Sequence, residues 1–437
     1  MLRRGCAGLA RAGRALLVAV SLSVSLNAGQ AAVLDPAVLL ADPSAADWKS
    51  LEEFSGTLTR AQFEQRLHEV FDPHGGLLPF LLITDQSVSI YDSPMKTGAP
   101  LATITFASSP ETCLAGPRYF RPPDAFRHGV ERFPLAGVRI VIEPADIGGD
   151  WGKLEDRSTI YPGYGRIQEG DLTLLVGKVL EAKLRALGAD VYITREGTQP
   201  ISGIEMADVE RIAGSVISQR PYRLPEAFRK RAGYMSASNP AYVKVASQFL
   251  LTKNLETLSR AENSRRRFRA DLTIVLQFDA TPRSCHARLT DINRNIFFVE
   301  GAYTASELGN DSCQRWKLLT KLLQNVTPTE RLVATNIARS FEDATGYPPV
   351  LYGDTAVTRA VGDTPYVVAR NLAFNREHDG PVVITEPYFM NQRVTLLRIL
   401  AGDYPGIEFV AGQMRESIFR EYADAIARGL VNAYGPD

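Results

Sequence analysis

A strand, an amphipathic helix and a second strand follow one another early in this chain. The first apolar run is VRIVIE at 138–143, and the second is ADVYITR at 189–195. Between them, residues 171–187 carry Leu and Val at helical spacing, and Gly188 suits the position just after a helix. A strand, a crossover helix and a strand pair in parallel with a right-handed connection. The segment therefore predicts part of a parallel sheet with helices packed on it.

Two further apolar runs and a closing helix extend this pattern. The runs are LTIVLQ at 272–277 and PVVITE at 381–386, and residues 420–434 have helical spacing. We therefore expect residues 137–437 to form an α/β domain, a twisted and mostly parallel sheet flanked by helices.

A smaller α+β domain is expected before it, over residues 33–133. Residues 58–71 predict a helix with Thr59 as its N-cap. Three strands are predicted at 77–84, 88–92 and 101–106. No residue here suggests chemistry, so a packing or wall-targeting module is the expected role.

The first 31 residues resemble a secretory signal. Four Arg precede ALLVAVSLSVSL at 15–26, and small residues follow. The alternative is an uncleaved anchor, although the run is shorter than the ~20 residues that span a bilayer. The signal predicts export to the periplasm or cell envelope and a mature protein without a transmembrane helix.

Charge and cysteine content limit the function of the exported chain. Without residues 1–31, Lys+Arg falls from 49 to 45 while Asp+Glu stays at 49, a net charge of about −4. That balance argues against a nucleic-acid binder. Cys113, Cys285 and Cys313 remain; an exported protein could pair Cys285 with Cys313, or all three could be buried thiols.

Residues 200–265 form a long, charged and helical insertion in the α/β domain. RPYRLP at 220–225 and ASNP at 237–240 divide it. Insertions of this length serve as lids or partner surfaces, or as an added packing layer. Both readings stay open at this point.

Polar residues end several of the predicted strands. In open α/β sheets the ligand crevice lies beyond the carboxyl ends of the strands, so these side chains are expected at one edge. Glu169, at the start of the 171–187 helix, is expected near the same edge. The strand-end residues are Glu143, Asp146, Arg195, Gln277, Asp279 and Glu386.

The stretch IEPADIGGDWG at 142–152 resembles the first motif of the zinc-dependent N-acetylmuramoyl-L-alanine amidases of the third type, which are peptidoglycan hydrolases. That motif reads I-D-P-G-H-G-G-x-D-x-G. The resemblance continues in the same order over residues 137–437. The second motif is EGDLTL at 169–174 followed by ALGADVYITR at 186–195, the third is ADLTIVLQFD at 270–279, and the fourth is PVVITEPYFMN at 381–391.

This resemblance implies roles for particular residues. Asp146 and Gln277 stand where the family has its metal-binding His residues, and Glu169 stands at the Glu ligand. Glu386 stands at the catalytic Glu, the general base. Arg195 and Asn391 lie within the second and fourth motifs and are expected to bind substrate.

Both imidazoles are thus replaced, which changes the expected metal chemistry. Catalytic zinc takes three ligands from His, Cys, Asp and Glu. Asp146 and Glu169 offer two oxygens, Gln277 is a poor zinc ligand, and Asp279 is an alternative third carboxylate. An all-oxygen set suits magnesium, calcium or manganese better than zinc. His286 and His378 lie near the later motifs and are expected in loops.

Two functions follow from the resemblance. The first is an exported amidase that cuts the bond between N-acetylmuramic acid and L-alanine, with a divalent metal and Glu386. The second is an inactive protein of the same fold that binds peptidoglycan or regulates a cell-wall hydrolase. The basic run RRRFR at 265–269 is either a contact for stem-peptide carboxylates or a solvated helix face.

Overall fold

The computed structural model describes residues 46–436, apart from 128–131, 220–235, 237, 282–286, 353 and 363. Residues 32–437 group into one compact unit. The expected signal, the break at 220–225 and the pairing of Cys285 lie outside the described residues.

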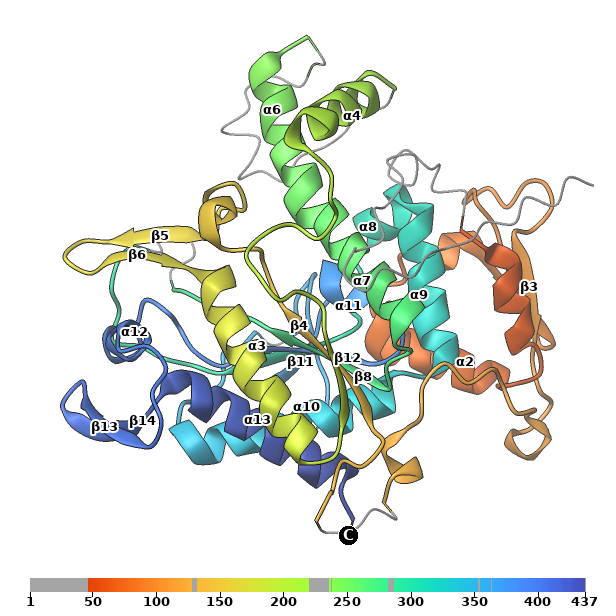
Figure 1. Cartoon of the computed structure of the whole chain (residues 1–437). Coiled ribbons are helices and arrows are strands. Elements are labelled where there is room, and N and C mark those ends of the chain that lie inside the picture. Colours follow the sequence, from red (N-terminus) through yellow and green to blue (C-terminus); the bar gives the residue numbers. More distant parts are fainter. Residues whose placement is uncertain are drawn as a thin grey trace, which may run out of the picture. The chain divides into compact units, whose positions relative to one another are not determined.

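A seven-stranded sheet forms the centre of this unit, in the order β10-β11-β9-β12-β8-β4-β7 (Figure 1). Four neighbouring strands run parallel: β7 (Asp190–Ile193), β4 (Arg139–Pro144), β8 (Leu272–Leu276) and β12 (Val382–Glu386). These are the four predicted strands, and the α/β class is confirmed. Three strands that the sequence did not predict complete the sheet: β9 (Ile296–Val299), antiparallel to β12, then β11 (Val367–Ala369) and β10 (Arg359–Ala360).

Apolar residues cover both faces of the sheet, as expected for parallel strands. Ile142 and Ile274 face one hydrophobic core, while Val275 and Ile384 face another. Helices that contribute to the first core include α3 (Glu169–Ala186), α10 (Thr327–Thr345) and α13 (Ile418–Tyr434). Helix α3 is the predicted crossover, and Gly188 follows it with φ +93°.

The N-terminal segment contains a helix and three strands, as predicted, and groups with the α/β region in one compact unit. An antiparallel sheet contains β1 (Leu81–Ile83), β2 (Ser87–Ile90) and β3 (Ala102–Thr105). Thr59 caps α2 (Arg60–Arg66) and forms a capping box with Gln62, as predicted, and a π-helical turn continues to Phe71. Trp48 and Phe63 of this N-terminal segment lie in the same hydrophobic core as Leu319 of α9 (Ser312–Gln324). A shared core explains why the two regions form one unit.

The insertion consists of helices that pack on one another. They are α4 (Met206–Gln219), α6 (Pro240–Phe249), a π-helical turn (Leu250–Leu255) and α7 (Glu256–Arg267). Asn239 caps α6, and Pro240 occupies its first position, so the predicted ASNP break is confirmed. Val209, Tyr242 and Leu251 lie in a small core of their own, and α4 and α6 stand out from the sheet in Figure 1. A partner surface here stays a prediction.

Short elements complete the chain. They are α8 (Ala305–Asn310), α11 (Ala373–Glu377), α12 (Arg393–Leu400), the hairpin of β5 (Ser158–Tyr161) with β6 (Gly165–Gln168), and the hairpin of β13 (Ile407–Val410) with β14 (Gln413–Glu416). Within the described residues, no helix has both the length and the apolar character required to cross a membrane.

A buried carboxyl group ties α10 to the sheet and makes stability depend on pH. Glu330 is fully buried and accepts hydrogen bonds from Val382 N (2.8 Å) and Glu300 N (3.2 Å). Burial raises the pKa of Glu330 to about 7, although Lys321 opposes the shift. Between pH 4.5 and 7 the folded state therefore holds a proton that the unfolded state has lost.

We predict that stability falls as pH rises through this window, because the folded state binds more protons than the unfolded state. Glu330 should contribute a loss of about 3 kcal/mol. Urea unfolding at several pH values should show a flatter pH dependence for Glu330→Gln, whatever its stability at pH 4.5. Asp343→Asn, an exposed change on the same helix, should keep the wild-type slope. If the free energy of unfolding fell equally with pH in wild type and Glu330→Gln, the raised pKa of Glu330 would be refuted.

Candidate functional site

A cavity of about 420 Å³ lies beyond the carboxyl ends of β4, β8 and β12. It brings together five residues that the sequence singled out: Asp146, Glu169, Gln277, Asp279 and Glu386. These residues come from positions far apart in the chain. The expectation that the polar strand ends meet at one edge of the sheet is therefore met for these residues.

The loop after β4 is built to hold Asp146 in the cavity. Asp146 itself has a left-handed backbone, with φ 59°. The buried Glu155 carboxylate accepts hydrogen bonds from Ile147 N and Gly148 N. The loop also touches the start of α3, where a Cβ on Gly170 would lie 2.3 Å from Gly148 N. This close approach explains the need for glycine at both positions.

Two cationic side chains contact the carboxylates that were predicted to bind metal. Lys253 Nζ, from the insertion, lies 2.8 Å from Asp146 Oδ1. Arg157 Nε lies 3.5 Å from Asp146 Oδ2 and 3.4 Å from Glu169 Oε2. The Asp146 and Glu169 side chains are only 2% and 5% exposed. The Arg157 guanidinium thus contacts both carboxylates, and the Lys253 ammonium group contacts Asp146.

These charges give the two carboxyl groups opposite pKa shifts. Burial raises the pKa of Glu169 well above its usual value, and the neighbouring Asp146 charge raises it further. Burial also opposes ionisation of Asp146, but Lys253 and Arg157 outweigh it and lower the pKa of Asp146. A cation bound between the two carboxyl groups would lower the pKa of both.

The donors around the cavity do not fit a zinc ion. Among the residues that the structure describes, no group of three or more His, Cys, Asp or Glu side chains is arranged to hold a metal. Asp279, the alternative third ligand, accepts a hydrogen bond from Ala280 N at 2.7 Å. Gln277 contributes only a neutral amide. Lys253 and Arg157 supply the positive charge that a metal would bring to Asp146 and Glu169.

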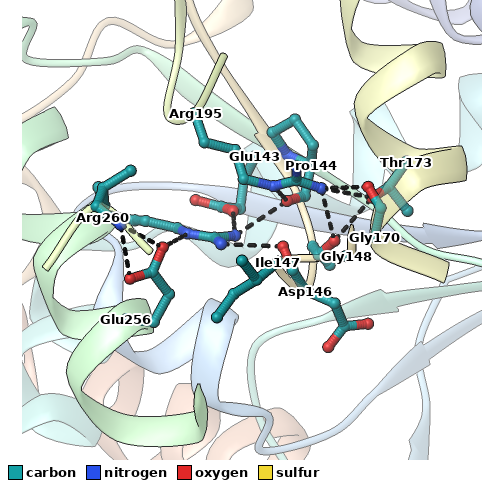
Figure 2. A network of polar contacts seen from close by, with 12 residues as sticks. Glu143, Pro144, Asp146, Ile147, Gly148, Gly170, Thr173, Arg195, Glu256 and Arg260 are labelled. Carbon is teal, nitrogen blue, oxygen red and sulfur yellow. Dashed lines mark hydrogen bonds and ion pairs between the residues drawn. The ribbon is translucent and has the colours of Figure 1, made fainter. Parts of the chain in front are cut away.

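A buried ionic network anchors the insertion beside the cavity (Figure 2). Arg260, on α7, is 1% exposed and pairs with Glu143 at 2.7 Å and with Glu256 at 2.9 Å. It also donates to the carbonyl oxygens of Pro144 and Asp146. Although burial opposes ionisation, Arg260 lowers the pKa of Glu143. The carboxylate at the end of β4 therefore holds α7 in place.

His378 belongs to this network as well. It was expected in an exposed loop, but it is 1% exposed and its Nε2 lies 3.4 Å from Glu143 Oε2. The residue follows α11 directly, so the end of this helix also meets the end of β4.

Arg195 and Asn391, which were predicted to contact substrate, are buried and bind backbone carbonyl groups. Arg195 is 2% exposed, and its guanidinium donates to the carbonyl oxygens of Pro144 (2.9 Å), Gly197 (2.9 Å) and Gly170 (2.5 Å) (Figure 2). Asn391 is fully buried and donates to the carbonyl oxygens of Thr281 and Arg288. Neither residue lines the cavity. A position near a strand end does not by itself show whether a side chain faces the cavity or binds backbone carbonyl groups.

Four basic residues around the site were not singled out from the sequence: Arg157, Lys253, Arg260 and Arg370. Lys253 and Arg260 belong to a charged helical segment whose basic residues look solvated by pattern alone. The one available signal was Glu143, because a carboxylate at the end of a buried strand requires a positive partner.

Comparisons with known proteins give no family assignment. No protein family and no curated protein matches the sequence. The structure is similar to Cwp6 from Clostridium difficile, with 13% identity and a TM-score of 0.34 over 68% of this chain but only 29% of that chain.

Two amidase structures match over most of their own length. The N-acetylmuramoyl-L-alanine amidase AmiC2 of Nostoc punctiforme is 14% identical, with a TM-score of 0.32 over 68% of this chain and 96% of that chain. The N-acetylmuramyl-L-alanine amidase Ami1 from Mycobacterium smegmatis is 14% identical, with a TM-score of 0.33 over 69% and 98%. Similarity at this level assigns neither an activity nor a ligand to this chain.

Proposed function

We propose that this chain is an exported protein of amidase-like fold that holds peptidoglycan in its cavity without metal-dependent hydrolysis. One observation carries the proposal: Lys253 and Arg157 pair with Asp146 and Glu169, the two carboxylates at the family's metal position. The order and spacing of four amidase motifs support peptidoglycan as the ligand. The expected signal at 1–31 supports a place in the periplasm or cell envelope.

The hydrolase alternative requires a metal to displace these cations. The two carboxylates are almost fully buried, whereas the Lys253 and Arg157 side chains are 26% and 38% exposed. While Lys253 and Arg157 stay in place, they repel a divalent cation and compete with it for the two carboxylates. Glu386, the expected general base, does line the cavity and is 9% exposed. A base alone provides no activated water, so its presence does not establish hydrolysis.

Purified cell-wall sacculi test the proposal. The mature protein should sediment with sacculi and should release no free stem peptide, with or without added zinc. Released peptide that is lost in Glu169→Ala would support the amidase alternative. Failure of the folded protein to sediment with sacculi would refute binding.

A further inference from the structure

The end of the basic run at 265–269 is not explained by the helix that carries its start. Arg265 and Arg266 lie in the last turn of α7, where the helix dipole favours cations, and both pair with Glu262. Arg269 lies beyond the helix. Its side chain makes no hydrogen bond or ion pair with any residue that the structure describes. A solvated helix face therefore accounts for Arg265 and Arg266 but not for Arg269.

Arg269 borders a cavity of about 360 Å³, and Arg118, Tyr119, Arg265 and Asp379 line it as well. The segments that follow Arg269 and Asp379 lead directly into β8 and β12, so this cavity lies at the amino ends of these strands. The candidate functional site lies beyond their carboxyl ends. The two cavities are therefore at opposite ends of the same strands.

The three chain segments around this cavity are held together by packing and by ionic contacts. Asp271 accepts a hydrogen bond from Arg121 N at 3.0 Å and pairs with the Arg121 guanidinium at 2.6 Å. A Cβ on Gly380 would lie 3.6 Å from Phe120 Cβ and 3.9 Å from Ala270 O. These contacts lie within three residues of the charged side chains that line the cavity. The backbone around the cavity is therefore fixed.

The backbone of Arg269 gives a further reason to examine its side chain. Its φ is 44°, in the left-handed region, just after the end of α7. Glycine adopts this conformation at the least cost and is the usual residue at such a position. Arginine is unfavourable for the backbone here, and a strained position of this kind points to a role for the side chain.

The charge of the lining favours an anion with two negative charges. Three arginines and one aspartate give the lining a formal charge of +2, and Glu262 removes only part of it because it is shared between Arg265 and Arg266. A phosphate monoester carries a charge of about −1.5 to −2 at pH 7, whereas a single carboxylate carries only one. Guanidinium groups bind phosphate through two parallel hydrogen bonds. The Tyr119 hydroxyl has no hydrogen-bond partner among the described residues and can donate to the same group.

We infer that this cavity binds a phosphate monoester, with Arg118 and Arg269 as its main contacts and Arg265 and Tyr119 as further donors. The phosphate belongs either to a small soluble ester or to a lipid headgroup, since both present the same chemical group. The site is separate from the candidate functional site, and the inference does not depend on the proposed function.

Calorimetric titration of the mature protein with glucose 6-phosphate tests the site. Glucose 6-sulfate, which has a similar shape but only one charge, serves as the second probe. Wild type should bind the phosphate ester at least about tenfold more tightly than the sulfate ester. Arg269→Gly should weaken binding of the phosphate ester about tenfold. The same change should not lower the stability measured by urea unfolding, because glycine suits the left-handed backbone.

Two further variants control for general charge effects. Arg118→Gln should weaken binding of glucose 6-phosphate as much as Arg269→Gly does. Arg266→Gln removes the same charge from the same basic run, but Arg266 does not line the cavity, so this variant should bind as wild type does.

Vesicles of phosphatidylcholine that contain phosphatidic acid distinguish the two sources of phosphate. Sedimentation with these vesicles that is lost in Arg269→Gly would assign the site to a lipid headgroup, and binding of glucose 6-phosphate without vesicle binding would assign it to a soluble ester. Three results would overturn the inference: equal affinity for the phosphate and sulfate esters, equal losses in Arg269→Gly and Arg266→Gln, or binding of neither glucose 6-phosphate nor vesicles.

Discussion

Replacing Arg260 with Met is expected to lower the free energy of unfolding by about 3–5 kcal/mol, the usual effect of removing one partner from a buried ion pair. Arg260 is the contact shared by Glu143 and Glu256, and all three side chains are at most 2% exposed. Met fills a similar volume, so the loss comes mainly from two buried carboxylates without a cation. Urea unfolding followed by circular dichroism measures the change.

A matched control is available at the end of the same helix. Arg266 is 62% exposed and pairs with Glu262 on the helix surface, so Arg266→Met should cost less than about 1 kcal/mol. Equal effects of the two substitutions would mean that the buried network does not hold the insertion to the sheet.

Rebuilding the two imidazoles should create a zinc site at positions 146, 169 and 277. The variant combines Asp146→His and Gln277→His with Arg157→Met and Lys253→Met. Two imidazoles and Glu169 form a His₂Glu set, a known catalytic zinc arrangement. Histidine tolerates the left-handed backbone at position 146 better than most residues. Zinc affinity should rise at least about 100-fold over wild type in a competition titration.

A second variant distinguishes the effect of removing the two cations from the effect of adding the two His ligands. Asp146→His with Gln277→His alone, retaining Arg157 and Lys253, should bind zinc more weakly than the fourfold variant because both cations still repel the metal. No zinc binding by a folded fourfold variant would show that positions 146, 169 and 277 do not share one site. Equal binding by both variants would show that the cations do not exclude metal.

The sheet was predictable because its four parallel strands are buried runs separated by a well-marked crossover helix. Strands β9, β10 and β11 were missed because each has only two to four residues and no alternation to distinguish it from a loop. The single-unit arrangement was missed for another reason. The pattern at Trp48 and Phe63 predicts that these residues are buried, but it does not say against which element.

The carboxylates of the site were predictable, and their cations were not. Asp146 follows the end of a strand and Glu169 begins a helix, and both positions can be recognised from the local sequence. Lys253 lies 107 positions from Asp146, and Arg260 lies 117 positions from Glu143. These partners are paired only by the fold, so the sequence left a rebuilt metal site and a metal-free site both open. The contacts of Lys253 and Arg157 with these carboxylates are the basis of the metal-free proposal.

Bound metal is the most direct test of the claim that Lys253 and Arg157 have taken the place of a metal ion. The mature protein and its Glu169→Ala variant should be incubated with zinc or manganese, freed of excess ion and measured by mass spectrometry. We predict no stoichiometric metal in either protein. Near-stoichiometric metal in wild type that disappears in Glu169→Ala would contradict this account and restore the metal-dependent amidase as the working mechanism.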